Sequence, residues 1–515
     1  MQAILKHSKN NKRIAKNVVM LYARMLIIMG VSLYTSRIVL NALGVDDYGI
    51  YNVVAGFVMM FTMISGSIGS AISRFITFEL GKSNQKKLNA IFSTAIILQI
   101  VTGVFIFILV ETGGVWFLTN KMVIPPDRML AAQWVLQFSL FSLLINLICV
   151  PYNAVIIAHE RMSAFTYISI IDVVGKLVIA YLITISAQDK LIIYALLMSS
   201  VALLIRLAYV IYCKRNFEEC KKIHFMFDKR LLKEMFGFAG WNFISIASTL
   251  MRNQGNNIVL NLFGGPAINA ARGISVQVNN AVTSFSTNFM VALNPQITKS
   301  YANGDRDYMM NLIFKGARLS FYVLLLISLP VLLNTNYLLS IWLGIVPANT
   351  VLFIQLALIL GMIEAISNPL ITAMLATGKI RKYQIVVGGF QLMNLPISYM
   401  LLKKGLFPEI ILVVAILISL LCLLITLYML KQMLGMPIIK FSKKVLLNVL
   451  LVSFISIVIP CILKFYLEVN FINVFLICLV TLLSTISTIY LVGCNRSEQE
   501  FVKNQITQFI HKKNI

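Results

Sequence analysis

The sequence predicts an all-α integral membrane protein with about fourteen transmembrane helices. Three observations lead to this fold class. The 515 residues are 59% hydrophobic and only 12% charged, with a mean hydropathy of +0.85, whereas soluble domains carry about 25% charged residues. Apolar windows of about 20 residues, enough to span a bilayer as a helix, recur along the whole chain. Lys and Arg are dense in every second connecting loop and sparse in the others.

The first apolar window follows a basic N-terminus, MQAILKHSKNNKRIAKN. A signal-peptide core has only about 7–15 apolar residues and a small-residue cleavage site after it, and neither feature is found here. We therefore expect an uncleaved first span. The predicted spans are 17–37, 49–72, 90–110, 134–157, 164–186, 191–212, 236–262, 266–291, 312–334, 350–375, 383–402, 409–430, 445–463 and 470–492.

The basic residues predict the topology of these spans. Thirty of the 44 Lys and Arg residues fall in the tails and loops that share a side with the N-terminus, and seven fall on the other side. Cytoplasmic loops carry such an excess, so both termini are expected in the cytoplasm. Topology also explains the net charge of +25, and we expect no nucleic-acid partner.

A weak internal repeat suggests that the chain was duplicated. The letters IVLN occur at residues 38–41 and 258–261, an offset of 220, and the proline-containing segments 150–165 and 368–383 align at an offset of 218. Six helices per copy is an even number, so the two copies would have the same orientation in the membrane. The expected domains are an N-lobe at 1–212, a basic linker at 213–235, a C-lobe at 236–430 and an appended helix pair with the tail at 431–515.

Charged residues inside spans are candidates for function, because an ionised group near the bilayer centre costs several kcal/mol and normally faces a cavity or a partner. Asp172 and Lys176 are four residues apart and can pair on one helix face, so we favour a structural role for them. Arg206 and Lys315 lie near the cytoplasmic interface, where their side chains can reach the headgroups. Glu364 is the other acid within the predicted spans.

The polar run RNQGNN, residues 252–257, stands out inside the seventh span. It contains Arg252 and Asn256 and is unfavourable against lipid, so it is expected to line a water-filled cavity. The alternative is an irregular break packed between helices. Arg272 begins the next polar span, INAARGISVQVNNAVTSFSTN, which also indicates a cavity face.

The first and ninth spans offer further cations. Arg24 and Arg37 are thirteen residues apart on the first span and therefore about 20 Å apart along the helix. Arg318 in the ninth span could face the same cavity. Clustered guanidinium groups bind a phosphate or diphosphate in a bidentate manner, and neighbouring amides and hydroxyls can bind sugar hydroxyls. The Cys and His residues show no metal-ligand spacing, so no metal or other cofactor is expected.

The segments SLYTSRIVLNALGVDDYGIYNVV (32–54) and SAISRFITFELGK (70–82) resemble the opening of Wzx-type polysaccharide flippases, the O-antigen and capsule repeat-unit translocases. Their superfamily also holds the lipid II flippase and the MATE exporters. The resemblance implies a MATE-like fold in the bacterial inner membrane. It implies transfer of undecaprenyl-diphosphate-linked oligosaccharides of lipopolysaccharide or capsule to the outer leaflet by alternating access. Membrane lipids and polysaccharide polymerase or assembly proteins are the implied partners.

The same resemblance implies cavity arginines in the first, second and eighth helices. Here the first helix has Arg24 and Arg37 and the eighth has Arg272, whereas the second has only Arg74 at its cytoplasmic end. At the offset of 220, Arg272 aligns with Asn52, so the cations are not duplicated between the lobes.

Two other functions remain open at this stage. A MATE-like secondary exporter of small cationic molecules would need carboxylates in its lobes, where this chain has few. A membrane glycosyltransferase could use Asp46 and Asp47, but these acids more simply precede and stabilise the N-terminus of the second helix. A transporter rather than an enzyme is therefore expected, and its energy source is not evident from the sequence.

Overall fold

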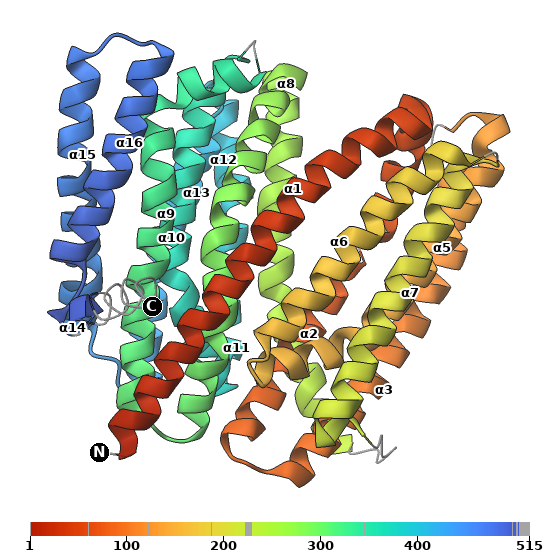
Figure 1. The fold of residues 1–515 in the computed structure, drawn as a ribbon, viewed down its shortest axis with the longest axis horizontal. Helices are drawn as coiled ribbons and strands as arrows, with labels where there is room; N and C mark the ends of the chain where they lie inside the picture. The colour runs from red at the N-terminus through yellow and green to blue at the C-terminus, as the bar shows by residue number, and fades with distance from the viewer. Residues whose placement is uncertain are drawn as a thin grey trace, which may run out of the picture. The chain divides into compact units, whose positions relative to one another are not determined.

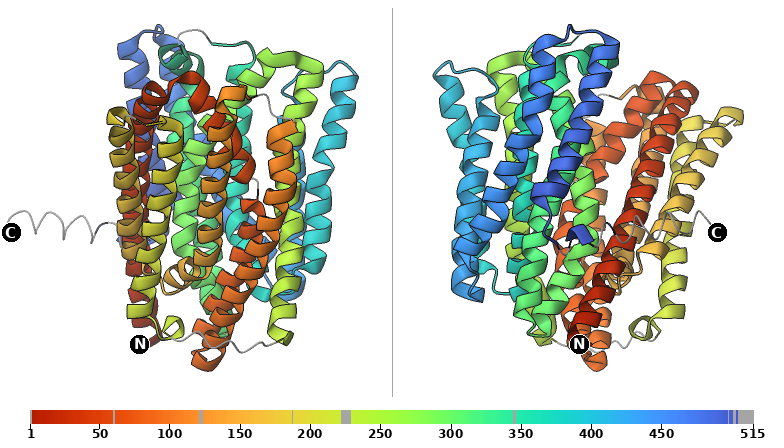
Figure 2. Two further views of the ribbon diagram at one scale, coloured as in Figure 1. Left: turned by 90° about the vertical axis from the view of Figure 1, so that its right-hand side faces the viewer. Right: turned by 60° about the vertical axis from the view of Figure 1, so that its left-hand side comes forward.

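The computed structural model describes residues 2–59, 61–120, 124–186, 188–221, 229–343, 346–496, 498–500 and 503, with only the backbone given for some of them, Arg37 included. All regular elements in these ranges are helices (Figures 1 and 2). Ten of the described helices are long and apolar enough to cross a membrane. The predicted all-α membrane fold class is confirmed.

The elements of the first half of the chain are α1 (Gln2–Met59), α2 (Thr62–Gly81), α3 (Gln85–Leu109), η1 (Val110–Gly114), α4 (Val115–Asn120), η2 (Pro126–Arg128), α5 (Met129–Ala158), α6 (Met162–Ile185), α7 (Lys190–Asn216), η3 (Glu218–Cys220) and α8 (Lys229–Ala302). The label η denotes a short 3₁₀ or π segment.

The elements of the second half are α9 (Arg306–Leu343), α10 (Thr350–Thr377), α11 (Arg381–Leu392), α12 (Asn394–Lys403), α13 (Ile410–Leu434), α14 (Ile438–Phe441), η4 (Ser442–Leu447), α15 (Asn448–Tyr466), α16 (Phe471–Thr488) and η5 (Ile489–Gly493).

Two long helices each cover more than one predicted span. The backbone of α1 leaves helical geometry at Gly44, with φ 79° and ψ 171°, which separates the first predicted span from the second. Glycine tolerates this positive φ because it has no Cβ. The 74 residues of α8 cover the seventh and eighth predicted spans, and the helix is assigned without a break between them.

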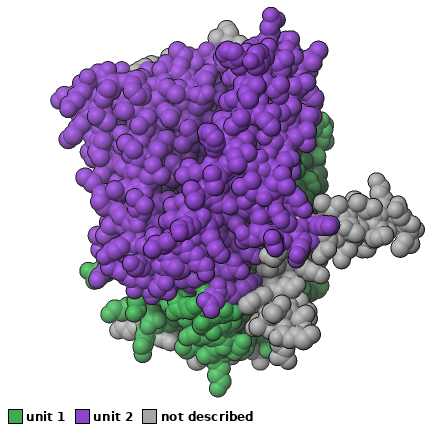
Figure 3. Space-filling model, turned by 90° about the vertical axis from the view of Figure 1, so that its left-hand side faces the viewer, with its two compact units in different colours: residues 1–247, 291–306, 375–381 green, residues 248–290, 307–374, 382–515 purple. Residues whose placement is uncertain are grey.

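The described chain forms two compact units (Figure 3). The first unit contains residues 1–247, 291–306 and 375–381, and the second contains 248–290, 307–374 and 382–515. The chain thus enters the second unit in the middle of α8 and returns to the first at the end of that helix. The predicted lobes, 1–212 and 236–430, are continuous in sequence, unlike these two units, and they stay a prediction.

Within the first unit, α5 packs along α7 and α2, and α1 packs along α6. These helices run side by side in Figure 1. The core between them is apolar, with Ile72, Phe92 and Val155 fully buried among many others. Apolar surface that packing removes from water contributes about 25 cal/mol per Å² to helix association. Where the helices are surrounded by lipid, close van der Waals packing stabilises their association instead.

The two proline segments that align at an offset of 218 have the same local structure. Pro151 lies inside α5 and Pro369 inside α10. Nine residues later, Glu160 and Gly378 both adopt a left-handed backbone, with φ of 59° and 74°. Each residue ends its helix in a tight turn before the next helix begins. This agreement supports the duplication that the sequence suggested.

A second pair of contacts is related by nearly the same offset, 220 or 221 residues. In the first unit, Arg128 donates to Asp189 at 2.7 Å and to Asp47 at 2.8 Å. In the second unit, the Nδ2 atom of Asn349 donates to Glu409 at 2.6 Å. Asp189 and Glu409 are 220 residues apart. Asp189 directly precedes α7, and Glu409 directly precedes α13. Burial alone would raise the pKa of Asp189, but the hydrogen bonds from Arg128 and backbone amides hold it below its usual value.

The turn at Glu160 is held by buried polar contacts within the first unit. Its carboxylate accepts hydrogen bonds from Gln296 Nε2 at 2.6 Å and from Lys299 Nζ at 2.8 Å, both on the last part of α8. Its backbone carbonyl accepts from Asn17 Nδ2 at 3.3 Å. The Glu160 side chain is fully buried, so these partners compensate its desolvation. We call these four residues the Glu160 cluster.

The predicted basic linker, 213–235, is only partly described. Its first residues end α7 and form η3, its last residues begin α8, and residues 222–228 lie outside the described part. Glu219 of η3 is buried and binds His159 Nε2 at 2.6 Å and Gln85 at 3.3 Å. Burial by itself would raise the pKa of Glu219, but the hydrogen bonds with His159 and Gln85 lower it overall.

Candidate functional site

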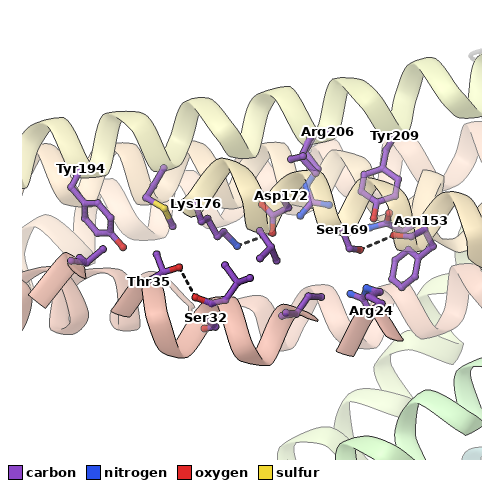
Figure 4. Close-up of a pocket in the computed structure, with 17 residues that line it drawn as sticks. Arg24, Ser32, Thr35, Asn153, Ser169, Asp172, Lys176, Tyr194, Arg206 and Tyr209 are labelled. Carbon is purple, nitrogen blue, oxygen red and sulfur yellow. Dashed lines mark hydrogen bonds and ion pairs between the residues drawn. The ribbon is translucent and has the colours of Figure 1, made fainter. Parts of the chain in front are cut away.

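The first unit contains a cavity of about 500 Å³ between α1, α5, α6 and α7, which we call the first cavity (Figure 4). Charged, hydroxyl and amide groups from all four helices converge on it. Its polar lining residues are Arg24, Ser32, Thr35, Asn153, Ser169, Asp172, Lys176, Tyr194, Arg206 and Tyr209.

Lys176 and Asp172 form the ion pair that their spacing predicts. The Lys176 Nζ atom lies 2.8 Å from Asp172 Oδ2, and both side chains are partly exposed to the cavity. The pair neutralises itself, so it adds little net charge to the first cavity. Its geometry fits the structural role that the sequence favoured.

Charge-swap variants are expected to test that role. Asp172→Lys and Lys176→Asp should each lower stability by about 0.5 kcal/mol, the usual scale for a partly exposed pair four residues apart. The double swap should recover most of the loss, but not all of it, since an acid preceding its base is the better order on a helix. Thermal unfolding of the purified variants measures this. A double swap less stable than both single variants would contradict it.

Arg24 and Arg206 place two further cations on the first cavity. The Arg24 guanidinium lies 4.4 Å from the centre of the Phe165 ring, and the Arg206 guanidinium lies 5.6 Å from that of Tyr209. In each arginine the Nε atom is buried without a hydrogen-bond partner in the described structure. The aromatic faces attract the cations without consuming their hydrogen-bond donors, which stay available to a ligand.

Arg37 lies on the same helix, α1, but its side chain is outside the described part of the structure. The predicted ladder of Arg24 and Arg37 therefore stays a prediction. Arg206, which the sequence placed near the interface, is a cavity residue.

The second unit contains a separate cavity of about 510 Å³, which we call the second cavity. It is lined by α8, α9, α10 and α13. The lining residues from 272 to 287 recur at helical spacing and form one face of that part of α8, and Thr249 and Arg252 come from an earlier part of it. Its polar lining residues are Thr249, Arg252, Arg272, Asn279, Asn280, Thr283, Ser286, Thr287, Glu364 and Asn368.

Arg252 has a carboxylate partner in the second cavity. Its Nη2 atom lies 2.9 Å from Glu364 Oε1 on α10. The side chain of Arg252 is only 10% exposed, whereas that of Glu364 is 40% exposed. The arginine is thus part of the cavity wall, and the carboxylate lies on the open side of the pair.

Arg272 has no such partner. It is 7% exposed and makes no hydrogen bond or ion pair with any residue that the structure describes, and its Nε atom is buried and unsatisfied. An isolated buried charge is costly, so this guanidinium is a strong candidate for binding an anion in the cavity.

Asn256 does not line the second cavity. Its Nδ2 atom donates to Asn394 Oδ1 of α12 at 2.8 Å, and both residues are almost fully buried. The polar run 252–257 is therefore divided: Arg252 faces the cavity, and Asn256 packs between helices, as the alternative interpretation of the run allowed. The side chains of Asn253, Gln254 and Asn257 are outside the described part.

Arg318 lines neither cavity. Its Nη2 atom binds both carboxylate oxygens of Glu498 at 2.7 Å, and Lys315 Nζ lies 3.8 Å from the same carboxylate. Arg318 is 4% exposed. These contacts hold the segment after α16 against α9 and give Arg318 a structural partner.

Arg74, the cation of the second helix, also has a structural environment. Its Nη2 atom donates to the backbone carbonyl of Ala376 at 3.2 Å, and aromatic rings surround the guanidinium. A Cβ at Gly378 would lie 2.4 Å from Arg74 Nη2, so the arginine side chain would have to shift, and the positive φ of 74° by itself favours glycine there. Arg74 is not among the lining residues of either cavity.

The fold is that of a MATE-type membrane exporter. A solved MATE in the straight conformation matches with a TM-score of 0.71 over 82% of this chain and 96% of that chain, at 12% identity. A MATE in the bent conformation matches with the same TM-score over 83% and 96%, at 11% identity. A MOP superfamily transporter from Pyrococcus furiosus Vc1 (DSM3638) matches with 0.67 over 82% and 96%, at 12% identity. Such low identities establish the fold alone.

The chain belongs to the family of polysaccharide biosynthesis proteins, which it matches over residues 14–301, more than half of its length. It is also 20% identical over 323 residues to the uncharacterized membrane protein EpsK of Bacillus subtilis (strain 168). That match spans 61% of this chain and 62% of EpsK. The protein is thus a multi-pass membrane protein of the polysaccharide biosynthesis family with a MATE-type fold, and the resemblance seen in the sequence is confirmed at this level.

Proposed function

We propose that this protein is a flippase for lipid-linked oligosaccharides. Its substrate is a glycan repeat unit on undecaprenyl diphosphate, which moves from the cytoplasmic to the outer leaflet of the bacterial inner membrane by alternating access. Both termini lie in the cytoplasm, as the distribution of Lys and Arg indicates. The family match and the MATE-type fold support the general class.

The observation that carries the proposal is the unpaired guanidinium of Arg272 in the second cavity. A diphosphate supplies the charge and the acceptor oxygens that this buried group lacks, and arginine binds phosphate oxygens in a bidentate manner. The amides and hydroxyls on the same face of α8, such as Asn279 and Thr283, suit a sugar.

The balance of charge favours an anion over a cationic drug. Charged residues of the first cavity are three cations and one acid, and those of the second are two cations and one acid. A cationic molecule would meet net repulsion in both cavities. Export of small cations is therefore the weaker alternative. For the glycosyltransferase alternative, Asp47 is already held by Arg128 at 2.5 Å, so its carboxylate is engaged.

A reconstituted transport assay tests the proposal. Proteoliposomes containing the protein should expose a fluorescent undecaprenyl-diphosphate-linked oligosaccharide to an enzyme outside the vesicle faster than protein-free vesicles do. A fluorescent lipid without the diphosphate should not respond to the protein. Equal rates with and without protein, or uptake of an organic cation instead, would contradict the proposal.

A further inference from the structure

In the second cavity, Glu364 forms an ion pair with Arg252, a cation that the proposed substrate would also bind. Arg252 and Arg272 line the same cavity, but among the residues that the structure describes a carboxylate partner is found for Arg252 and not for Arg272. A ligand with one phosphate can be satisfied by Arg272 alone. A ligand with two phosphates gains from both guanidinium groups, and Glu364 competes with it for the charge and the Nη2 donor of Arg252.

The exposure of the pair indicates how this exchange takes place. The side chain of Arg252 is 10% exposed in the cavity wall, and that of Glu364, which lines the same cavity, is 40% exposed. A hydrated carboxylate can leave a partly exposed pair at modest cost. Arg252 then keeps its position for the incoming anion.

The later part of α8 lies close to α10 near Glu364. A Cβ at Gly361, three residues before Glu364, would lie 2.9 Å from both Asn279 Oδ1 and Thr283 Cγ2 of α8. Glycine thus permits a close approach of the two helices one turn from the ion pair. Gly361, Glu364 and Asn368 line the second cavity from this face of α10.

We propose that Glu364 is an internal competitor of the substrate: its carboxylate holds Arg252 in the empty cavity, a diphosphate displaces it, and its return promotes release of the ligand. Glu364 thereby selects a diphosphate over a monophosphate, because only the diphosphate compensates for the broken ion pair. This inference rests on the proposed function and adds a positioning residue and a selectivity to it.

Binding measured on the purified protein in lipid nanodiscs tests the inference. The probes are undecaprenyl diphosphate, undecaprenyl monophosphate and undecaprenol, and native mass spectrometry reads their binding. Glu364→Gln removes the competing charge and should lower the Kd for the diphosphate about tenfold, with a smaller change for the monophosphate. Its transport rate should fall although its binding is tighter. Glu468→Gln, an exposed carboxylate between α15 and α16, is the matched control.

A double-variant cycle separates this role from a merely structural one. In the Arg252→Gln background, Glu364→Gln should no longer change the Kd, because the two residues act as one pair. Equal Kd values for the wild type and Glu364→Gln, with binding lost in Arg272→Ala, would overturn the inference alone. Two results would contradict the proposed function and the inference with it. In the first, the wild type binds undecaprenyl diphosphate no more tightly than Arg272→Ala does. In the second, the wild type binds undecaprenyl diphosphate no more tightly than it binds undecaprenol.

Discussion

Replacing Arg272 with Ala is expected to lower the rate of lipid-linked oligosaccharide transport by at least about 30-fold, because truncating a desolvated charged partner costs about 2 kcal/mol or more. Arg272→Lys should recover only part of the rate, since an ammonium group cannot bind two phosphate oxygens in the planar manner of a guanidinium. The measurements are restoration of surface polysaccharide in cells lacking the protein and the proteoliposome assay.

The control for Arg272→Ala is Arg215→Ala, which removes an exposed arginine at the end of α7. Both variants should be produced in normal amounts and elute as single species, because Arg272 makes no hydrogen bond or ion pair among the described residues that its loss would break. Normal transport by Arg272→Ala at normal expression would remove the main support for the proposed anion site.

The second large effect is expected on stability. Glu160→Ala should destabilise the first unit by about 3 kcal/mol, because it leaves the ammonium of Lys299 and the amide of Gln296 without their buried acceptor. The melting temperature of the purified protein, followed by tryptophan fluorescence, measures this loss. Glu160→Gln keeps an acceptor oxygen but loses the charge, so its melting temperature should lie between those of Glu160→Ala and the wild type.

Backbone strain at position 160 has its own control. Alanine and glutamate are similarly disfavoured at φ 59°, whereas glycine is not. Glu160→Gly should therefore be slightly more stable than Glu160→Ala while losing the same polar contacts. A Glu160→Ala variant with the melting temperature of the wild type would show that the Glu160 cluster contributes nothing to stability.

The sequence predicted features that depend on local spacing. The apolar windows of about 20 residues predicted the membrane-spanning helices, and polar positions after Arg272, such as Asn279 and Thr283, line the second cavity. The pair of Asp172 and Lys176 lies within one turn of a helix, so its contact was also predictable.

Contacts between distant segments could not be predicted in this way. Arg252 pairs with a carboxylate 112 residues away, and Arg318 pairs with one 180 residues away. A charge pattern along one helix does not show which other helix will face it. For that reason Arg318 was expected on the cavity, whereas the structure places it with Glu498.

The internal repeat gave correct information of another kind. It aligned Glu160 with Gly378, and both residues occupy a left-handed turn. The backbone was evidently retained, and the chemistry of the turn diverged: one copy carries a buried carboxylate, and the other has the space that Arg74 occupies. Sequence comparison could show the equivalence of the positions but not what each turn contacts.

The Glu160 cluster also imposes an order on synthesis of the chain. Lys299 follows Glu160 by 139 residues, and ribosomes add about 5–20 residues per second. The turn after α5 therefore emerges roughly 7–28 s before its ammonium partner exists. During that interval a carboxylate destined for complete burial must remain hydrated or be shielded by the insertion machinery. The first unit is thus completed from segments made late in translation and cannot mature as an independent N-terminal product.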